Sequence, residues 1–332
     1  MSFCFQALSL LILIGSADVF AQSYNSQTKL SDVLKSLQVP MPKHYVKVDA
    51  KLAAKGKDIF FNGITTNENG ASLTIQSAAF KCIDCHNVVK EDPDLRFNDP
   101  DARLSYAQEN KIPLLPGTTM YGTVNKSMWF GGDYEKKYGA ALIAPAKYDL
   151  DGAIQLCSRE CSKGRALSDY ELKAMTHYLW SLEYKLSDLN LSSNELAQLN
   201  NKNISNKSKV SLIESKYLKD LDVTFSKAPS DFEIGYGYQG DANRGKIVFE
   251  QSCLHCHDTT SQIPGIKKFP TNKLLTFKYL NRMKNSYEII RHGKFDDPNI
   301  YMPNYSLERL SDRALDDLKA YFDLKIQELS NN

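Results

Sequence analysis

Two short stretches decide how this chain folds: CIDCH at residues 82–86 and CLHCH at residues 253–257. In each, two cysteines three positions apart are followed directly by a histidine. This pattern is typical of covalent haem c attachment, in which both thiols bond to the porphyrin and the imidazole ligates the iron. A zinc site would need a second C-x-x-C pair for each motif, and neither half offers one. The sequence therefore predicts two covalently bound haem c groups, attached through Cys82, Cys85, His86, Cys253, Cys256 and His257.

The two motifs lie in similar surroundings. A helix that contains a Gly-Lys pair is predicted before each motif, and an amphipathic helix closes each half after a long loop. The stretches are 49–63 and 168–184 in the first half, and 240–252 and 311–326 in the second. Ser168 and Glu171 have the spacing of a capping box at the start of the first closing helix. This order of helix, motif, loop and helix resembles class I cytochrome c domains, which implies a mainly α fold with two such domains in tandem.

The expected domain boundaries follow from this duplication. We expect a first cytochrome c domain at residues 22–186 and a second at 238–332. The stretch between them, 187–237, is rich in Asn, Ser and Lys, which indicates a linker or a wrapping segment. It is too long for a simple hinge, and helix is expected around residues 189–199.

The first 21 residues predict export. An apolar core at residues 7–14 is followed by small residues up to Ala21, as in a cleaved secretory signal, although the usual basic start is missing. A membrane anchor is the alternative, but the apolar run is too short to cross a bilayer. We therefore expect a periplasmic protein that is not an integral membrane protein. The formal net charge is only +2, which argues against a nucleic-acid partner.

Each haem iron has a second axial position, and its occupant decides the chemistry. Met302, directly followed by Pro303, lies 45 positions after His257 and just before the last helix, the usual place of a methionine ligand in class I cytochromes c. A core methionine is the alternative. The first half has no Met-Pro pair at the matching place before its closing helix. Its candidate ligands are Met120, Met128, Cys157, Cys161 and His177.

Cys157 and Cys161 occupy the corresponding place in the first half. The string CSRECSKGRAL, residues 157–167, resembles the Cys…Gly-Arg segment of dihaem thiosulfate dehydrogenases and of the Sox A subunit. The resemblance implies that Cys157 is an axial iron ligand and the catalytic sulfur. It also implies cationic side chains for an anionic substrate, with Arg165 and, second, Arg159 as the nearest candidates. Ala153 stands where the family tends to have an arginine. A Cys157–Cys161 disulfide is the alternative, because exported proteins favour disulfides.

The loop between His86 and Cys157 is the second departure from the family, since it is 71 positions long. Its residues 113–139 alternate glycine, aromatic and polar residues without a helical or strand period. The stretch is expected to be either a lid that shapes the substrate site or a structural wrap over the haem edge.

Three functions are compatible with the sequence. The first is oxidation of thiosulfate to tetrathionate, with electrons passing from the first haem to the second and on to an external cytochrome or other acceptor. The second is a Sox A-like subunit that attaches thiosulfate to a carrier protein. The third is a dihaem electron carrier without enzymatic activity. A methionine-ligated second domain on the same chain favours the first, because the electron acceptor is already built in.

Overall fold

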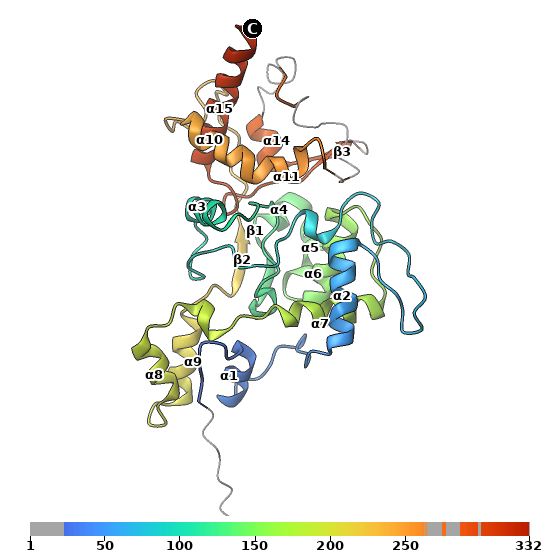
Figure 1. Cartoon of the computed structure of the whole chain (residues 1–332), viewed down its shortest axis with the longest axis vertical. Coiled ribbons are helices and arrows are strands. Elements are labelled where there is room, and N and C mark those ends of the chain that lie inside the picture. The colour runs from blue at the N-terminus through green and yellow to red at the C-terminus, as the bar shows by residue number, and fades with distance from the viewer. Residues whose placement is uncertain (1–22, 262, 264–273, 277–285, 298–299, 332) are drawn as a thin grey trace, which may run out of the picture.

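The computed structural model describes residues 23–261, 263, 274–276, 286–297 and 300–331. The expected signal, residues 1–21, lies outside the described residues. Helices dominate, and the chain forms three units along its long axis (Figure 1). The second half carries α10, α14 and α15 at one end. The first half, with α2 to α7, lies in the middle, and a small unit of α1, α8 and α9 lies at the other end.

The elements of the first half include the first attachment motif and the cysteine pair. They are α2 (Ala50–Asn62), the 3-10 turn η1 (Cys82–Asp84), α3 (Pro100–Asn110), η2 (Thr123–Asn125), β1 (Met128–Gly132), α4 (Tyr134–Tyr138), α5 (Ala140–Lys147), α6 (Leu150–Leu156), the π-helical turn η3 (Cys157–Cys161) and α7 (Asp169–Ser181). The capping box is present as expected at the start of α7, where Ser168 and Glu171 each bond the other's backbone amide. The elements of the second half are α10 (Ala242–Val248), the π-helical turn η5 (Phe249–Cys253), α11 (Leu254–His257), α14 (Ser286–His292), the antiparallel strands β3 (Lys294–Asp297) and β4 (Ile300–Met302), and α15 (Asp312–Ser330).

One helix pair is repeated in both halves. In the first, α2 crosses α7 so closely that a Cβ atom on Gly56 would lie 2.1 Å from the carbonyl oxygen of Ala174. In the second, α10 crosses α15, and a Cβ atom on Gly245 would lie 1.9 Å from the carbonyl oxygen of Asp317. The glycine of each Gly-Lys pair is therefore the point where the opening helix contacts the backbone of the closing helix, and the two halves share this packing.

This contact gives a prediction about stability. Gly56→Ala should destabilise the protein by about 1–3 kcal/mol, because the added methyl forces α2 and α7 apart. The steric cost of separating the two helices exceeds the roughly 1 kcal/mol by which alanine stabilises a helix relative to glycine. Thermal unfolding followed by circular dichroism measures the effect, with exposed Asp58→Ala on the same helix as the control. A melting temperature unchanged in Gly56→Ala would show that the helices do not meet at this glycine.

The long loop of the first half contains regular structure that its lack of period did not predict. It includes α3, β1, α4 and α5, and β1 pairs in parallel with β2 (Asp220–Val223). Gly132 allows this pairing, because its φ is +63° and a Cβ atom there would lie 2.2 Å from the carbonyl oxygen of Val223. The stretch is therefore a folded part of the first half.

The expected linker 187–237 is also largely structured. It begins with the turn η4 (Leu186–Leu189) and contains α8 (Ser193–Asn200) and α9 (Asn206–Glu214). These helices share an apolar core with α1 (Leu30–Ser36), to which Leu30, Leu199 and Ile213 contribute fully buried side chains. After β2 the chain runs along the molecule to the second half. There the carboxylate of Asp316 accepts hydrogen bonds from the backbone amides of Tyr236 and Tyr238. The segment is thus a helical unit followed by a connecting stretch that reaches the second half.

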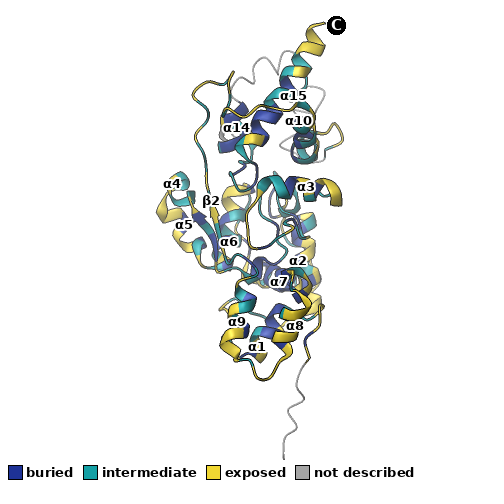
Figure 2. Cartoon of the chain, turned by 90° about the vertical axis from the view of Figure 1, so that its left-hand side faces the viewer, coloured by how far each residue is buried: buried dark blue, intermediate teal, exposed yellow. Residues whose placement is uncertain are grey.

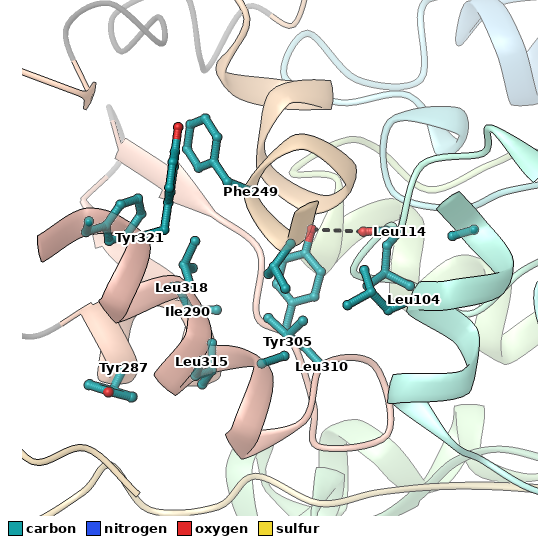
Figure 3. Packing of buried hydrophobic residues seen from close by; sticks show 14 residues of the cluster. Leu104, Leu114, Phe249, Tyr287, Ile290, Tyr305, Leu310, Leu315, Leu318 and Tyr321 are labelled. Carbon is teal, nitrogen blue, oxygen red and sulfur yellow. Dashed lines mark hydrogen bonds between the residues drawn. The ribbon is translucent and has the colours of Figure 1, made fainter. Parts of the chain in front are cut away.

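The core of the second half extends into the first. Leu104 and Leu114 pack with Tyr305, Leu310 and Phe249 in one buried cluster (Figure 3). The hydroxyl of Tyr305 donates to the backbone carbonyls of Ser252 at 2.9 Å and Leu114 at 3.4 Å. In Figure 2 the buried residues continue through this junction, whereas the last turns of α15 are exposed. The two halves are therefore joined by a common core.

Candidate functional site

The first attachment motif holds His86 in a defined orientation. Its Nδ1 lies 2.6 Å from the backbone carbonyl oxygen of Thr118 and donates to it. The proton on Nδ1 leaves the lone pair on Nε2, which is the arrangement that an iron-ligating imidazole needs. Gly117 lies flat against the ring, since a Cβ atom there would be 2.4 Å from Cε1. Burial lowers the pKa of His86, which favours the neutral ring.

Cys157 lies near this open nitrogen. Its Sγ is 3.9 Å from Nε2 of His86. With bond lengths typical of a divalent first-row metal, an imidazole nitrogen and a thiolate on opposite sides of one ion stand roughly 4.3 Å apart. The observed separation is close to that value, so His86 and Cys157 would be able to hold the iron of a haem if Cys82 and Cys85 attach one.

A polar scaffold holds the turn that carries Cys157. The amide of Gln76 donates to the carbonyl and hydroxyl of Ser158, at 3.0 and 2.9 Å, and to the hydroxyl of Ser162 at 2.7 Å. The hydroxyl of Ser77 donates to the carbonyl of Ser162 at 2.5 Å. A Cβ atom on Gly164 would lie 2.4 Å from the carbonyl oxygen of Gln76. The glycine of the Gly-Arg pair therefore allows the turn to lie directly on residues 76–77.

Arg165, expected first among the substrate-binding cations, is used within the protein. Its five N–H donors go to the carboxylate of Glu171, by two bonds, and to the carbonyls of Thr74, Ile75 and Ala166. No donor is left for a substrate, so Arg165 fixes the end of the cysteine turn to α7. Arg159 is exposed and forms no hydrogen bond or ion pair with the residues that the structure describes, which leaves it as a candidate.

Cys161 lies beside Cys157 at the surface, and the structure shows both as free thiols. A hydrogen bond with Cys157 raises the pKa of the Cys161 thiol well above its usual value. Tyr301 reaches this turn from the second half and donates its hydroxyl to the carbonyl of Cys161. Its ring lies 5.4 Å from Nζ of Lys163. Residues of both halves therefore surround the cysteine pair.

The other candidate ligands of the first half have different environments. His177 accepts a hydrogen bond from the backbone amide of Asp49 at 3.0 Å through its Nδ1, which supports a packing role. Met128 is buried in β1, and Met120 packs beside the apolar clusters between α2, α6 and α7. Among these candidates, the structure places the Cys157 sulfur against the open nitrogen of His86.

In the second half, His257 ends α11 and Met302 ends β4. Cys253 and Met302 both pack against the buried cluster that contains Phe249 and Leu318. The methionine and the attachment cysteine thus pack against the same core. Its role as the axial ligand remains a prediction.

The two attachment motifs contact each other. The ring of His255, the variable residue of the second motif, lies close to Asp84 of the first, and burial lowers its pKa. Its Nε2 is buried and has no hydrogen-bond partner among the described residues, which fits a site that would hold a bulky group. The ring of Phe80 packs on that of Tyr301, with centroids 4.9 Å apart, and Cys256 lies against the same small cluster. His255 therefore lies between the two motifs.

Sequence reasoning missed the residues that hold the ligands. Gly117, Thr118 and Gln76 act through backbone atoms or through an amide, and no motif identifies them. The one available signal is the run of proline and glycine at 113–117, which indicates a tight, defined segment.

Comparison with known proteins gives one match. Residues 240–322 match the family model described as cytochrome C oxidase, cbb3-type, subunit III. No curated protein and no solved structure matches the chain significantly. Across the residues that the structure describes, no helix combines the length and the apolar character needed to span a bilayer. Residues 240–322 therefore resemble a cytochrome c domain, which implies covalently bound haem c and indicates haem-based electron transfer.

Proposed function

We propose that the chain is a periplasmic dihaem cytochrome c that oxidises thiosulfate to tetrathionate, with both halves acting as cytochrome c domains. The observation that carries this proposal is the Cys157 sulfur 3.9 Å from Nε2 of His86. The shared helix packing around Gly56 and Gly245 supports a common fold for the two halves. The cysteine turn resembles the corresponding segment of thiosulfate dehydrogenases, and the short distance from its sulfur to His86 supports the role that this resemblance implies for Cys157.

The haem groups supply two one-electron acceptors, and the chain supplies the nucleophile. The thiolate of Cys157 forms a sulfur–sulfur bond to thiosulfate and gives a cysteine–thiosulfonate, while two electrons leave the site. A second thiosulfate then attacks the bonded sulfur, which releases tetrathionate and restores the thiolate. Each substrate is a dianion, so a cationic side chain is needed beside the sulfur. Arg159 and Lys163 are the cations on the turn, and Lys163 already lies over Tyr301.

The order of the two sites sets the direction of electron flow. A thiolate ligand favours a low reduction potential, and a methionine ligand favours a high one. Electrons that enter at Cys157 would therefore move downhill toward the Met302 side, and from there to an external cytochrome or other acceptor. The closeness of His255 to Asp84 supports a short path between the two motifs.

Low-temperature EPR of the oxidised protein tests the ligands. We expect one low-spin signal of the thiolate type and one of the His/Met type. Met302→Leu should remove only the second, which assigns each signal to its half of the chain. Two His/Met or His/His signals would instead favour a dihaem electron carrier without sulfur chemistry.

Cys161 should assist rather than carry out the reaction. Its sulfur is not the one that faces His86, so Cys161→Ser is expected to keep the thiolate-type signal and to lower turnover less than tenfold. Stopped-flow reduction by thiosulfate and EPR on the same sample measure both. A Cys161→Ser protein without the thiolate signal would show that Cys161 provides the ligand.

A further inference from the structure

A short segment of the first half, Leu114–Thr118, connects the His86 ring to the second half. We call it the histidine strap. Its Thr118 carbonyl accepts from His86 Nδ1, and its Gly117 amide donates to the carbonyl of Cys85 at 2.9 Å. At the other end, the Leu114 amide donates to the carbonyl of Gln251 in the second half, also at 2.9 Å. The strap is therefore held between the two motifs.

Arg309 of the second half holds the middle of this strap. Its Nε and Nη2 both donate to the carbonyl of Leu115, at 3.1 and 2.6 Å. Its Nη1 and Nη2 also donate to the carboxylate of Glu91, at 2.7 and 3.2 Å. Glu91 in turn accepts from the amide of Asn87, the residue after His86, at 2.6 Å. Arg309 and Glu91 are 4% and 2% exposed, so this network is held away from water.

Two branches of contacts connect Arg309 to His86. One branch runs from Arg309 through Leu115 to the Thr118 carbonyl on Nδ1, and the other runs through Glu91 to Asn87. A planar guanidinium with several fixed donors can serve both branches at once, whereas an ammonium group cannot do so in the same geometry. Because buried hydrogen-bonded charges are rigid, the position of Arg309 fixes the histidine strap and the imidazole ring of His86.

We propose that Arg309 is a positioning residue for His86, so that the second domain sets the ligand geometry and the reduction potential of the first haem site. The inference rests on the proposed haem at that site, and not on thiosulfate as the substrate. Partners beyond the first ligands of a metal are known to tune its properties through such hydrogen bonds. Here that partner comes from the other half of the chain.

Arg103 offers a matched control. It is 2% exposed, forms an ion pair with Asp92 at 2.6 Å, and donates to the carbonyl of Glu308 across the same junction. It resembles Arg309 in burial, charge and interdomain contact. Within the described residues, Arg103 forms no hydrogen bond or ion pair with the histidine strap. A general loosening of the junction should therefore have the same effect in variants of either arginine.

The experiment is an EPR-monitored redox titration of the dihaem protein, in which each signal reports its own site. For Arg309→Lys we expect a threefold to tenfold change in the equilibrium constant for reduction of the first site, at most about 59 mV for one electron. The second site should keep its potential, and Arg103→Lys should leave the first site unchanged. Equal shifts in both lysine variants, or no shift in Arg309→Lys, would overturn the proposal.

A second variant tests the proposal if the single substitution Arg309→Lys prevents folding. Arg309→Met combined with Glu91→Met leaves no unpaired buried charge, and such replacements often preserve stability. It should shift the first site as Arg309→Lys does, because Leu115 loses its donors in both. A wild-type potential in this double variant contradicts the positioning role. Absence of a thiolate signal in the parent would count against thiosulfate chemistry, but the shift itself would still be measurable.

Discussion

Cys157→Ala loses thiosulfate oxidation by at least about a thousandfold, as expected when the nucleophile of a covalent mechanism is removed. The reason is geometric: the Cys157 sulfur is the one that lies 3.9 Å from Nε2 of His86. Alanine keeps the π-helical turn, because Gln76 holds that turn through Ser158 and Ser162. Steady-state reduction of an artificial acceptor by thiosulfate measures turnover, and absorbance at the haem bands confirms that both groups are attached.

Two controls separate this result from general damage. The variant should still accept electrons from dithionite and pass them to the acceptor, because the second half is unchanged. Arg165→Met should instead reduce thermal stability, since it breaks the bidentate pair with Glu171, whose oxygens lie 2.6 and 2.8 Å from the guanidinium. A Cys157→Ala protein with near-normal turnover would remove the basis of the sulfur mechanism.

Gly117→Ala is expected to damage the first site almost as strongly. The added Cβ would lie 2.4 Å from Cε1 and 2.5 Å from Nδ1 of His86, well inside van der Waals contact. The ring must turn away, which breaks its hydrogen bond to Thr118 and moves Nε2 from its place opposite Cys157. Loss of such an orienting partner typically costs 10–100-fold in metal affinity or activity. We expect at least that loss of turnover, together with loss of most of the thiolate-type EPR signal.

The neighbouring residue gives the control for this prediction. Thr118 binds His86 through its backbone carbonyl, so Thr118→Ala keeps the acceptor and should keep the signal. The His/Met signal of the second half should be unaffected in both variants. If Gly117→Ala retains a normal thiolate signal, His86 is not held against the strap as described.

The sequence was sufficient for features that depend on neighbouring residues. The capping box of Ser168 and Glu171 and the closing helices are local patterns, and local hydrogen bonds decide them. Met302 was chosen in the same way, from its place before the last helix. The fold class was predictable for this reason, because helices repeat every few residues.

Features that depend on distant partners could not be predicted. The strand β1 has five residues, and its partner β2 begins 92 positions after it, at Asp220. The sequence indicated that Arg165 is a free cation. Its guanidinium, however, donates hydrogen bonds to the carbonyls of residues 74 and 75, which are far away in the sequence. The part of the site that the sequence missed is the part made by backbone atoms, which carry no side-chain signature.

The contribution of residues 301–309 to the first site has a consequence for how the protein is made. Tyr301, Tyr305 and Arg309 are translated long after CIDCH, yet they cover the turn and the strap beside it. In the proposed periplasmic dihaem protein, a haem on the first motif would therefore be enclosed only when the last quarter of the polypeptide has emerged. This order would leave the first motif open for thioether ligation during most of the export.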